Sequence, residues 1–180
     1  WFNAPVPSFG ELSSSLLIVG LAPGLQGANK TGRPFTGDYA GDLLYKTIKK
    51  YNFSKGKYAG TIDDNLKLKD CTITNAVRCV PPQNKPISEE INNCNNFLKK
   101  TIEIHKNLKV IIALGLIAHK SIISALNLKQ KLYKFKHGNK HKIDHLILID
   151  SYHCSRYNTN TGRLTSKMFD MVLKDVVSLL

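Results

Sequence analysis

Residues 16–38 read LLIVGLAPGLQGANKTGRPFTGD, so an apolar run of strand length passes directly into a polar loop that contains five glycines. A short run that is apolar throughout is typical of a strand covered on both faces of a parallel sheet. Glycine lets the backbone adopt positive φ and approach a ligand closely. We therefore expect a buried strand whose carboxyl end opens into a binding loop, because open α/β sheets bind ligands at that edge.

Three further apolar runs and four helical patterns extend this arrangement along the chain. The predicted strands are Leu16–Gly20, Cys71–Val77, Val110–Leu114 and Leu146–Asp150. The predicted helices are Asp38–Tyr51, Ser88–His105, Ala118–Leu126 and Thr165–Leu180. Strands that alternate with helices predict an α/β fold, namely a three-layer α/β/α sandwich with a central four-stranded, mostly parallel sheet. A length of 180 residues without a repeat or a linker predicts one domain over residues 1–180.

The charge of the chain favours a polyanionic partner. Lys and Arg number 26 against 13 Asp and Glu, a net charge of +13. Such an excess is typical of nucleic-acid binding, which phosphate neutralisation drives largely without regard to base sequence. An Asn- and Lys-rich composition without functional meaning is the alternative. A hydrophobic content of 42% excludes a disordered chain. No run approaches the roughly 18 apolar residues of a membrane-spanning helix, so no membrane partner is expected.

The first residue of the chain and its cysteines indicate whether the chain is a fragment and in which cellular compartment we expect it. The chain begins with Trp1 and not with Met, which favours a fragment that lacks its true N-terminus. Residues 1–11 carry no basic cluster and no apolar core of a signal peptide. Four scattered cysteines are too few for a secreted disulfide scaffold. We therefore expect a cytoplasmic protein, associated with the nucleoid if its partner is DNA.

The segment after the last predicted strand, residues 151–165, reads SYHCSRYNTNTGRLT. Its arginines, hydroxyl groups and amides lead into a helix N-terminus and form a dense set of phosphate donors. Tyr157 beside Arg156 is either an ordinary surface pair or a wedge that enters a duplex. In the first loop, Phe35 is either a plug that closes the core or a platform on which a base stacks. Lys30-Thr31 does not end a phosphate-binding P-loop, because Asn29 stands where that motif needs glycine.

Together with residues 74–86, TNAVRCVPPQNKP, these two loops resemble three signature segments of the uracil-DNA glycosylase superfamily, specifically its family 5, or B-type, branch. The resemblance runs from about Pro5 to the C-terminus in the order and approximate spacing of that family. It implies a monofunctional DNA glycosylase of base excision repair. Such an enzyme flips uracil, hypoxanthine or xanthine out of double-stranded DNA and hydrolyses the N-glycosidic bond. We expect it to act as a monomer.

The resemblance also implies roles for individual residues. His153 would hydrogen-bond the carbonyl of the leaving base, and Asn75 would read that base and take part in catalysis. The expected base-binding residues are Phe35, Asn75, Ala22 and Gly24. Gly24 stands where other branches carry the carboxylate or amide that activates water, which leaves Asp38 as the nearest candidate. Asp38 at a predicted helix start is equally well explained as an N-cap.

The expected DNA contacts lie in the two loops and are Lys30, Arg33, Ser155, Arg156, Tyr157, Asn158, Thr161 and Arg163. The lysines between residues 129 and 142 are interpreted as a solvated face. An alternative function is a DNA-binding module that kept this scaffold and lost catalysis. Gly24 and an incomplete cysteine set motivate that alternative.

The resemblance also implies a 4Fe–4S cluster, whose usual ligands are thiolates. Cys79 and Cys94 match the two downstream metal ligands of the related branches. The upstream C-x-x-C pair is not found in residues 1–180, so this chain would supply two of the four ligands. Without the resemblance, both cysteines would be interpreted as small buried apolar residues.

Overall fold

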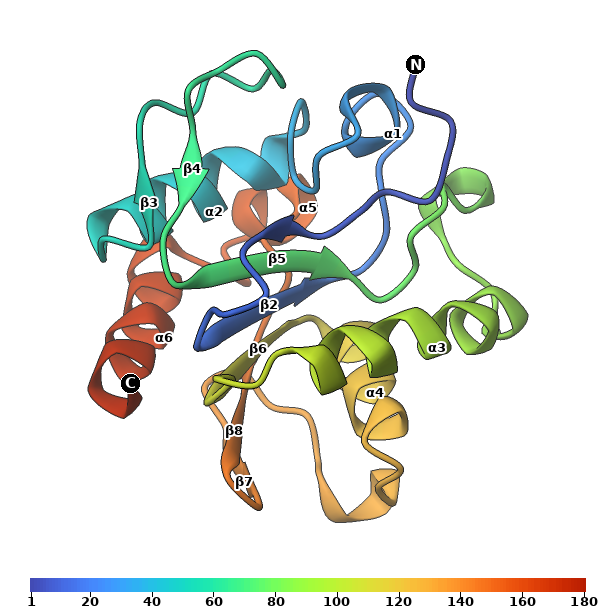
Figure 1. The fold of residues 1–180 in the computed structure, drawn as a ribbon, viewed down its shortest axis with the longest axis vertical. Helices are drawn as coiled ribbons and strands as arrows, with labels where there is room; N and C mark the ends of the chain where they lie inside the picture. Colours follow the sequence, from blue (N-terminus) through green and yellow to red (C-terminus); the bar gives the residue numbers. More distant parts are fainter.

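The computed structural model describes residues 1–180 and shows a central sheet between two layers of helices (Figure 1). Four parallel strands form the middle of the sheet, in the order β5 (Cys71–Asn75), β2 (Leu16–Gly20), β6 (Val110–Leu114) and β8 (Leu146–Ser151). These strands match the four apolar runs. The expected α/β fold with a mostly parallel sheet is therefore confirmed.

The expected count of four strands is wrong, because the main sheet has six. β1 (Phe9–Gly10) pairs antiparallel with β5 at one edge, and β7 (Lys140–Ile143) pairs antiparallel with β8 at the other. β1 is only two residues long, and β7 reads KHKI, so neither shows a continuous apolar run. Edge strands tolerate such sequences because one side faces solvent. A separate two-stranded ribbon joins β3 (Ser54–Lys55) to β4 (Lys67–Leu68).

The four long helices lie where the sequence predicts them, with ends that shift by no more than two residues. They are α2 (Tyr39–Lys50), α3 (Ser88–Ile104), α4 (Leu116–Ala125) and α6 (Ser166–Leu179). The short elements were not predicted, because they have too few residues to show a helical period of hydrophobic residues. They are α1 (Ala28–Thr31), α5 (Arg156–Asn160) and the 3₁₀ turns η1 (Pro82–Asn84) and η2 (Gln130–Leu132). None of the helices combines the length and the apolar character needed to cross a bilayer.

The sheet separates two hydrophobic cores. Leu16 and Ile18 of β2 pack into the core shared with α2 and α6, whereas Leu17 and Val19 pack into the core shared with α3 and α4. Successive strand residues point to opposite faces, and here both faces are covered. This double burial explains why β2 is apolar at every position. β2 pairs in parallel with β5 and, through β6, runs parallel to β8. The carboxyl ends of these strands therefore lie at the same edge of the sheet.

Candidate functional site

The loops that follow β2, β5 and β8 meet around a cavity of about 370 Å³ at the carboxyl edge of the sheet. Its lining residues are Leu21, Ala22, Pro23, Gly24, Asp38, Asn84, His153 and Ser155. A second cavity of about 370 Å³ lies on the other side of His153 and is lined mainly by residues of the β6–α4 junction and of the segment after β8. The two loops singled out from the sequence therefore build one site, with His153 between its two hollows.

A buried acceptor, an aromatic ring and a glycine stand together behind the cavity lining, where Gly20 precedes Leu21 and Phe35 stacks on His153. Asn75 and Phe35 do not themselves line the cavity. Gly20 and Asn75 are register partners at the ends of β2 and β5. A Cβ atom at Gly20 would lie 2.4 Å from both Asn75 Oδ1 and the Phe35 ring, so only glycine leaves room for their approach. Asn75 Oδ1 is buried and has no hydrogen-bond partner within the protein. Because an unpaired buried acceptor is costly, it is suited to a ligand that brings an N–H.

His153 faces Phe35 across the site. The two rings are stacked with centroids 5.9 Å apart and planes inclined by 29°. The side-chain amide of Asn158 donates to the backbone oxygen of His153 at 2.9 Å and fixes the segment after β8. Burial lowers the pKa of His153 to about 4, since the charged ring loses its hydration. The imidazole is therefore neutral near pH 7 and can donate one N–H.

The two carboxylate oxygens of Asp38 have different surroundings. Its Oδ1 accepts from the Gly41 backbone N–H at 3.3 Å, so Asp38 is the N-cap of α2. Its Oδ2 faces the glycine loop, where a Cβ atom at Gly24 would lie 3.6 Å away and one at Gly27 only 2.7 Å away. Burial raises the pKa of Asp38 above its ordinary value. The capping role observed here leaves one carboxylate oxygen on the cavity side.

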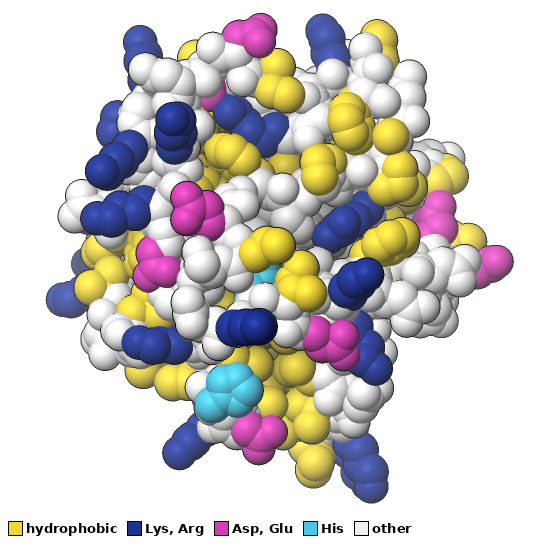
Figure 2. Space-filling model, viewed as in Figure 1, with side chains coloured by type: hydrophobic (Ala, Val, Ile, Leu, Met, Phe, Trp, Pro, Cys, Tyr) yellow, Lys and Arg dark blue, Asp and Glu magenta, His cyan; other side chains and the backbone are white.

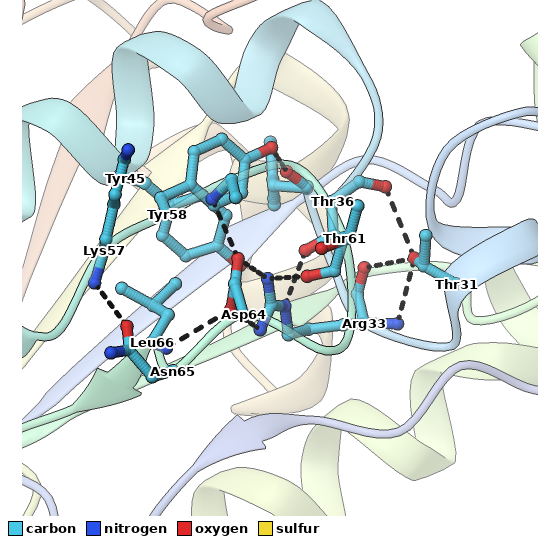
Figure 3. A network of polar contacts seen from close by, with 12 residues as sticks. Thr31, Arg33, Thr36, Tyr45, Lys57, Tyr58, Thr61, Asp64, Asn65 and Leu66 are labelled. Atoms are coloured by element: carbon cyan, nitrogen blue, oxygen red, sulfur yellow. Dashed lines mark hydrogen bonds and ion pairs between the residues drawn. The ribbon is translucent and has the colours of Figure 1, made fainter.

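The expected phosphate contact of Arg33 needs correction, because its guanidinium is buried in the protein (Figure 3). Nη1 and Nη2 donate to the two oxygens of Asp64 at 2.7 and 2.8 Å. Nε donates to Thr36 Oγ1 at 2.7 Å, and Nη2 also donates to the Thr61 carbonyl at 2.8 Å. A bidentate pair of this kind satisfies the planar guanidinium. Arg33 therefore joins the glycine loop to residues 56–66, and because four of its five N–H groups are bonded within the protein and the side chain is buried, it is not available to DNA.

Tyr45 and Tyr58, which lie beside this polar network in Figure 3, bond the backbone around Phe35. The Tyr58 hydroxyl donates to the Phe35 carbonyl at 3.0 Å, and the Tyr45 hydroxyl donates to the Pro34 carbonyl at 2.6 Å. Phe35 has φ of +56°, a left-handed conformation that costs free energy for a residue with a side chain. The network holds the backbone in that conformation, so the ring stays beside Asn75 and His153.

Of the other expected DNA contacts, the charged side chains and Tyr157 are exposed, whereas the side chains of Ser155, Asn158 and Thr161 make hydrogen bonds within the protein. Lys30, Arg156 and Arg163 are exposed and lie over the rings of Trp1, Tyr39 and Tyr152. Tyr157 on α5 is 71% exposed. Ser155 Oγ caps α5, Asn158 holds His153, and Thr161 Oγ1 donates to the Tyr157 carbonyl. Figure 2 shows Lys and Arg over much of one face, with fewer Asp and Glu.

Cys79 and Cys94 are accessible, unlike the other two cysteines. Cys79 is exposed and Cys94 is partly exposed, whereas Cys71 and Cys154 are buried. Burial raises the pKa of Cys79, and the nearby Cys94 raises it further. Two neighbouring accessible thiols fit half of a four-thiolate cluster site, and the interpretation of Cys79 as a buried apolar residue is wrong. The described residues contain no second accessible pair, so these 180 residues do not complete a cluster.

Sequence reasoning missed Leu21, Pro23 and Asn84 in the cavity and the support of Phe35 by Tyr45, Tyr58 and Asp64. The first three directly follow β2 or lie in the segment after β5. The rule that ligands bind beyond the carboxyl ends of strands could have found them. No local pattern indicates the partners of Phe35, since they come from α2 and the β3–β4 ribbon.

Comparisons with known proteins agree with this geometry. A family model described as "Uracil DNA glycosylase superfamily" matches residues 7–177. A type-5 uracil-DNA glycosylase of Thermus thermophilus is 40% identical over 178 residues, which cover 97% of this chain and 80% of that protein. One of Pyrobaculum aerophilum is 36% identical over 174 residues, with 97% and 76% covered. The cavity, the two signature loops and these matches show that the chain is a DNA glycosylase that belongs to the type-5 branch of the uracil-DNA glycosylase superfamily.

Proposed function

We propose that this enzyme flips uracil out of duplex DNA, hydrolyses its N-glycosidic bond and leaves an abasic site with the backbone intact. The observation that carries the proposal is the buried, unpartnered Oδ1 of Asn75 beside the stacked rings of Phe35 and His153. A planar base that enters this site gains a stacking partner and pairs an otherwise orphaned acceptor. The names of the relatives, which specify uracil, support the same substrate.

The same recognition extends the proposal to hypoxanthine and xanthine. Deamination turns a ring-nitrogen acceptor into an N–H donor and an amino group into a carbonyl. This N–H and carbonyl pair occurs in all three deaminated bases and in neither cytosine nor adenine. A buried acceptor at Asn75 Oδ1 would select the N–H, because an unprotonated ring nitrogen would leave two acceptors facing each other. Guanine and thymine also carry an N–H beside a carbonyl, so the rejection of these two bases has to come from the shape of the site and not from Asn75.

Hydrolysis of the glycosidic bond leaves negative charge on the departing base. In the proposed mechanism the neutral His153 donates its N–H to the base carbonyl on which that charge develops. Asn158 holds the backbone of His153, and the ring stacks on Phe35. Asp38 Oδ2, which faces the glycine loop, positions or deprotonates the attacking water. Its raised pKa makes it a stronger base than an ordinary carboxylate.

Duplex binding in this proposal rests on exposed side chains around the cavity mouth. Lys30, Arg156 and Arg163 neutralise phosphates, and Tyr157 enters the duplex where the flipped base leaves the stack. Ser155 adds its hydroxyl at the rim of the cavity. We expect one copy of the chain to be sufficient for this contact.

The test is single-turnover excision from duplexes with one uracil, hypoxanthine or xanthine, with and without subsequent alkali. All three duplexes should give strand breaks only after alkali. Asn75→Ala should slow all three reactions at least about 100-fold, the scale of one lost preorganised group. Asn160→Ala, an exposed amide of α5, is the matched control. Retained duplex binding without any abasic product would instead favour a DNA-binding module, and product from uracil alone would contradict the broader substrate range.

A further inference from the structure

Two histidines and one aspartate form a compact cluster at the β7 edge of the sheet, apart from the base site. His119 comes from α4, His141 from β7, and Asp150 from the end of β8. His119 Nδ1 lies 2.7 Å from Asp150 Oδ1, and His141 Nε2 lies 2.8 Å from Asp150 Oδ2. One ligand atom from each residue lies within 4.8 Å of the others. His119 and Asp150 are almost completely buried, and His141 is partly buried.

The second nitrogen of His119 decides what the cluster can bind. Nε2 lies 2.9 Å from the Tyr133 carbonyl, to which it can only donate. In the neutral ring the single proton is therefore on Nε2, and the lone pair of Nδ1 points at a carboxylate oxygen. Two acceptors at 2.7 Å need a cation between them. A backbone carbonyl that orients the outer nitrogen of a histidine in this way is the usual arrangement around a bound metal ion.

The ligand atoms are close enough for a metal ion to draw them together. Zinc bonds to imidazole nitrogen and carboxylate oxygen are about 2.0–2.2 Å long, so two ligands of one ion lie at most about 4.2 Å apart. The observed atoms spread over up to 4.8 Å, about 0.6 Å more than this span, so the side chains would close around the ion on binding. An ion that binds both oxygens of Asp150 would have one imidazole nitrogen next to each oxygen. This is the observed arrangement, with His119 Nδ1 next to Oδ1 and His141 Nε2 next to Oδ2. The Phe135 ring lies edge-on to His119 at 5.6 Å, and Tyr133 lies 5.8 Å from His141, so aromatic rings line the cluster.

We propose that His119 Nδ1, His141 Nε2 and the Asp150 carboxylate form a Zn²⁺ site with three protein ligands. Two imidazoles with one carboxylate favour zinc over magnesium or calcium, which prefer oxygen ligands. The ion would join α4 and β7 to the end of β8, three residues before His153. The rival occupant is a proton that makes His119 an imidazolium.

The test measures zinc stoichiometry on the full chain after chelation and dialysis, with Zn²⁺ alone as the probe. Cys79→Ser with Cys94→Ser removes the accessible thiols, which could otherwise bind the same ion. We expect one equivalent of Zn²⁺ to remain in this double variant. Co²⁺ in its place should give visible ligand-field bands without the strong near-ultraviolet absorption of a thiolate complex. Absence of a stoichiometric ion from the double variant, or a thiolate spectrum, would overturn the proposal.

Variants then locate the ion. His141→Ala removes the most accessible ligand and should weaken Zn²⁺ binding at least about 100-fold, since even outer-shell partners contribute 10- to 100-fold. His145→Ala, an exposed histidine of the same hairpin, should leave the affinity unchanged. Equal affinity in wild type and His141→Ala would show that the cluster holds a proton. If His141→Ala does not fold, Asp150→Asn is measured in its place, and the stoichiometry of the double cysteine variant still decides whether an ion binds.

Discussion

Asp64→Asn removes the charge against which Arg33 is buried while keeping the shape of the side chain. The side chains of Arg33 and Asp64 are 6% and 2% exposed, so water cannot replace the lost partner. Removal of one member of a buried ion pair costs about 3–5 kcal/mol. Asparagine has one oxygen, so it can keep only one of the two bonds from the backbone N–H groups of Ala59 and Leu66, which use different oxygens of Asp64. We therefore take the lower end of that range, about 3 kcal/mol, as the minimum cost. For a chain of this length, that cost corresponds to a fall in Tm of about 6–12 °C.

Thermal and urea unfolding at pH 7 measure this change, with the exposed neighbour variant Asp63→Asn as the control. Arg33→Met combined with Asp64→Asn removes both charges and should recover most of the loss, because no unpaired buried charge remains. The hydrogen bonds from Arg33 hold the pKa of Asp64 below its ordinary value. The ion pair therefore contributes stability above about pH 4, and this contribution is lost as the pH falls further. A Tm shift under about 2 °C at pH 7, or a double variant as unstable as Asp64→Asn, would refute the reasoning.

Three further predictions concern the base site. His153→Ala should slow single-turnover excision at least about 100-fold, since the lost donor acts on the leaving base. The affinity for duplex DNA should stay within about twofold. An excision rate within about twofold of wild type, measured on folded protein, would remove His153 from the mechanism. Because burial raises the pKa of Asp38, the excision rate should increase with pH as Asp38 loses its proton, and this increase should be absent in Asp38→Asn. His153 titrates near pH 4 and does not account for the increase. The same pH–rate profile in wild type and Asp38→Asn would count against Asp38. Arg156→Ala should weaken duplex binding and reduce its salt slope by about 0.9, whereas Lys131→Ala should leave that slope unchanged.

The fold could be predicted where burial acts on consecutive residues. β2 and β6 are covered on both faces, so every one of their residues is apolar and the sequence pattern identifies them directly. β7 alternates exposed lysines with partly or fully buried residues over four positions, which is too short to indicate a strand. The two edge strands were missed for that reason, and with them the full width of the sheet.

The candidate site could be predicted where it follows a strand directly. The segments after β2 and β8 carry Phe35 and His153, and Asn75 is the last residue of β5; the structure brings the three together because parallel strands end at one edge. Arg33 was misassigned because it lies in the same loop as residues that do face the cavity. A basic residue in a glycine-rich loop has the same local pattern whether it contacts phosphate or a buried carboxylate.

The sequence by itself therefore determined the central strands, the four long helices and the loops that build the base site, because each is encoded by residues adjacent or periodic along the chain. The tertiary structure alone decided the partners of the buried charges. Arg33 meets Asp64, and His119 meets Asp150, each across 31 positions of sequence. Composition and periodicity report whether a residue is buried or exposed. They do not report which distant side chain it faces, since that depends on how the helices and loops pack against the sheet.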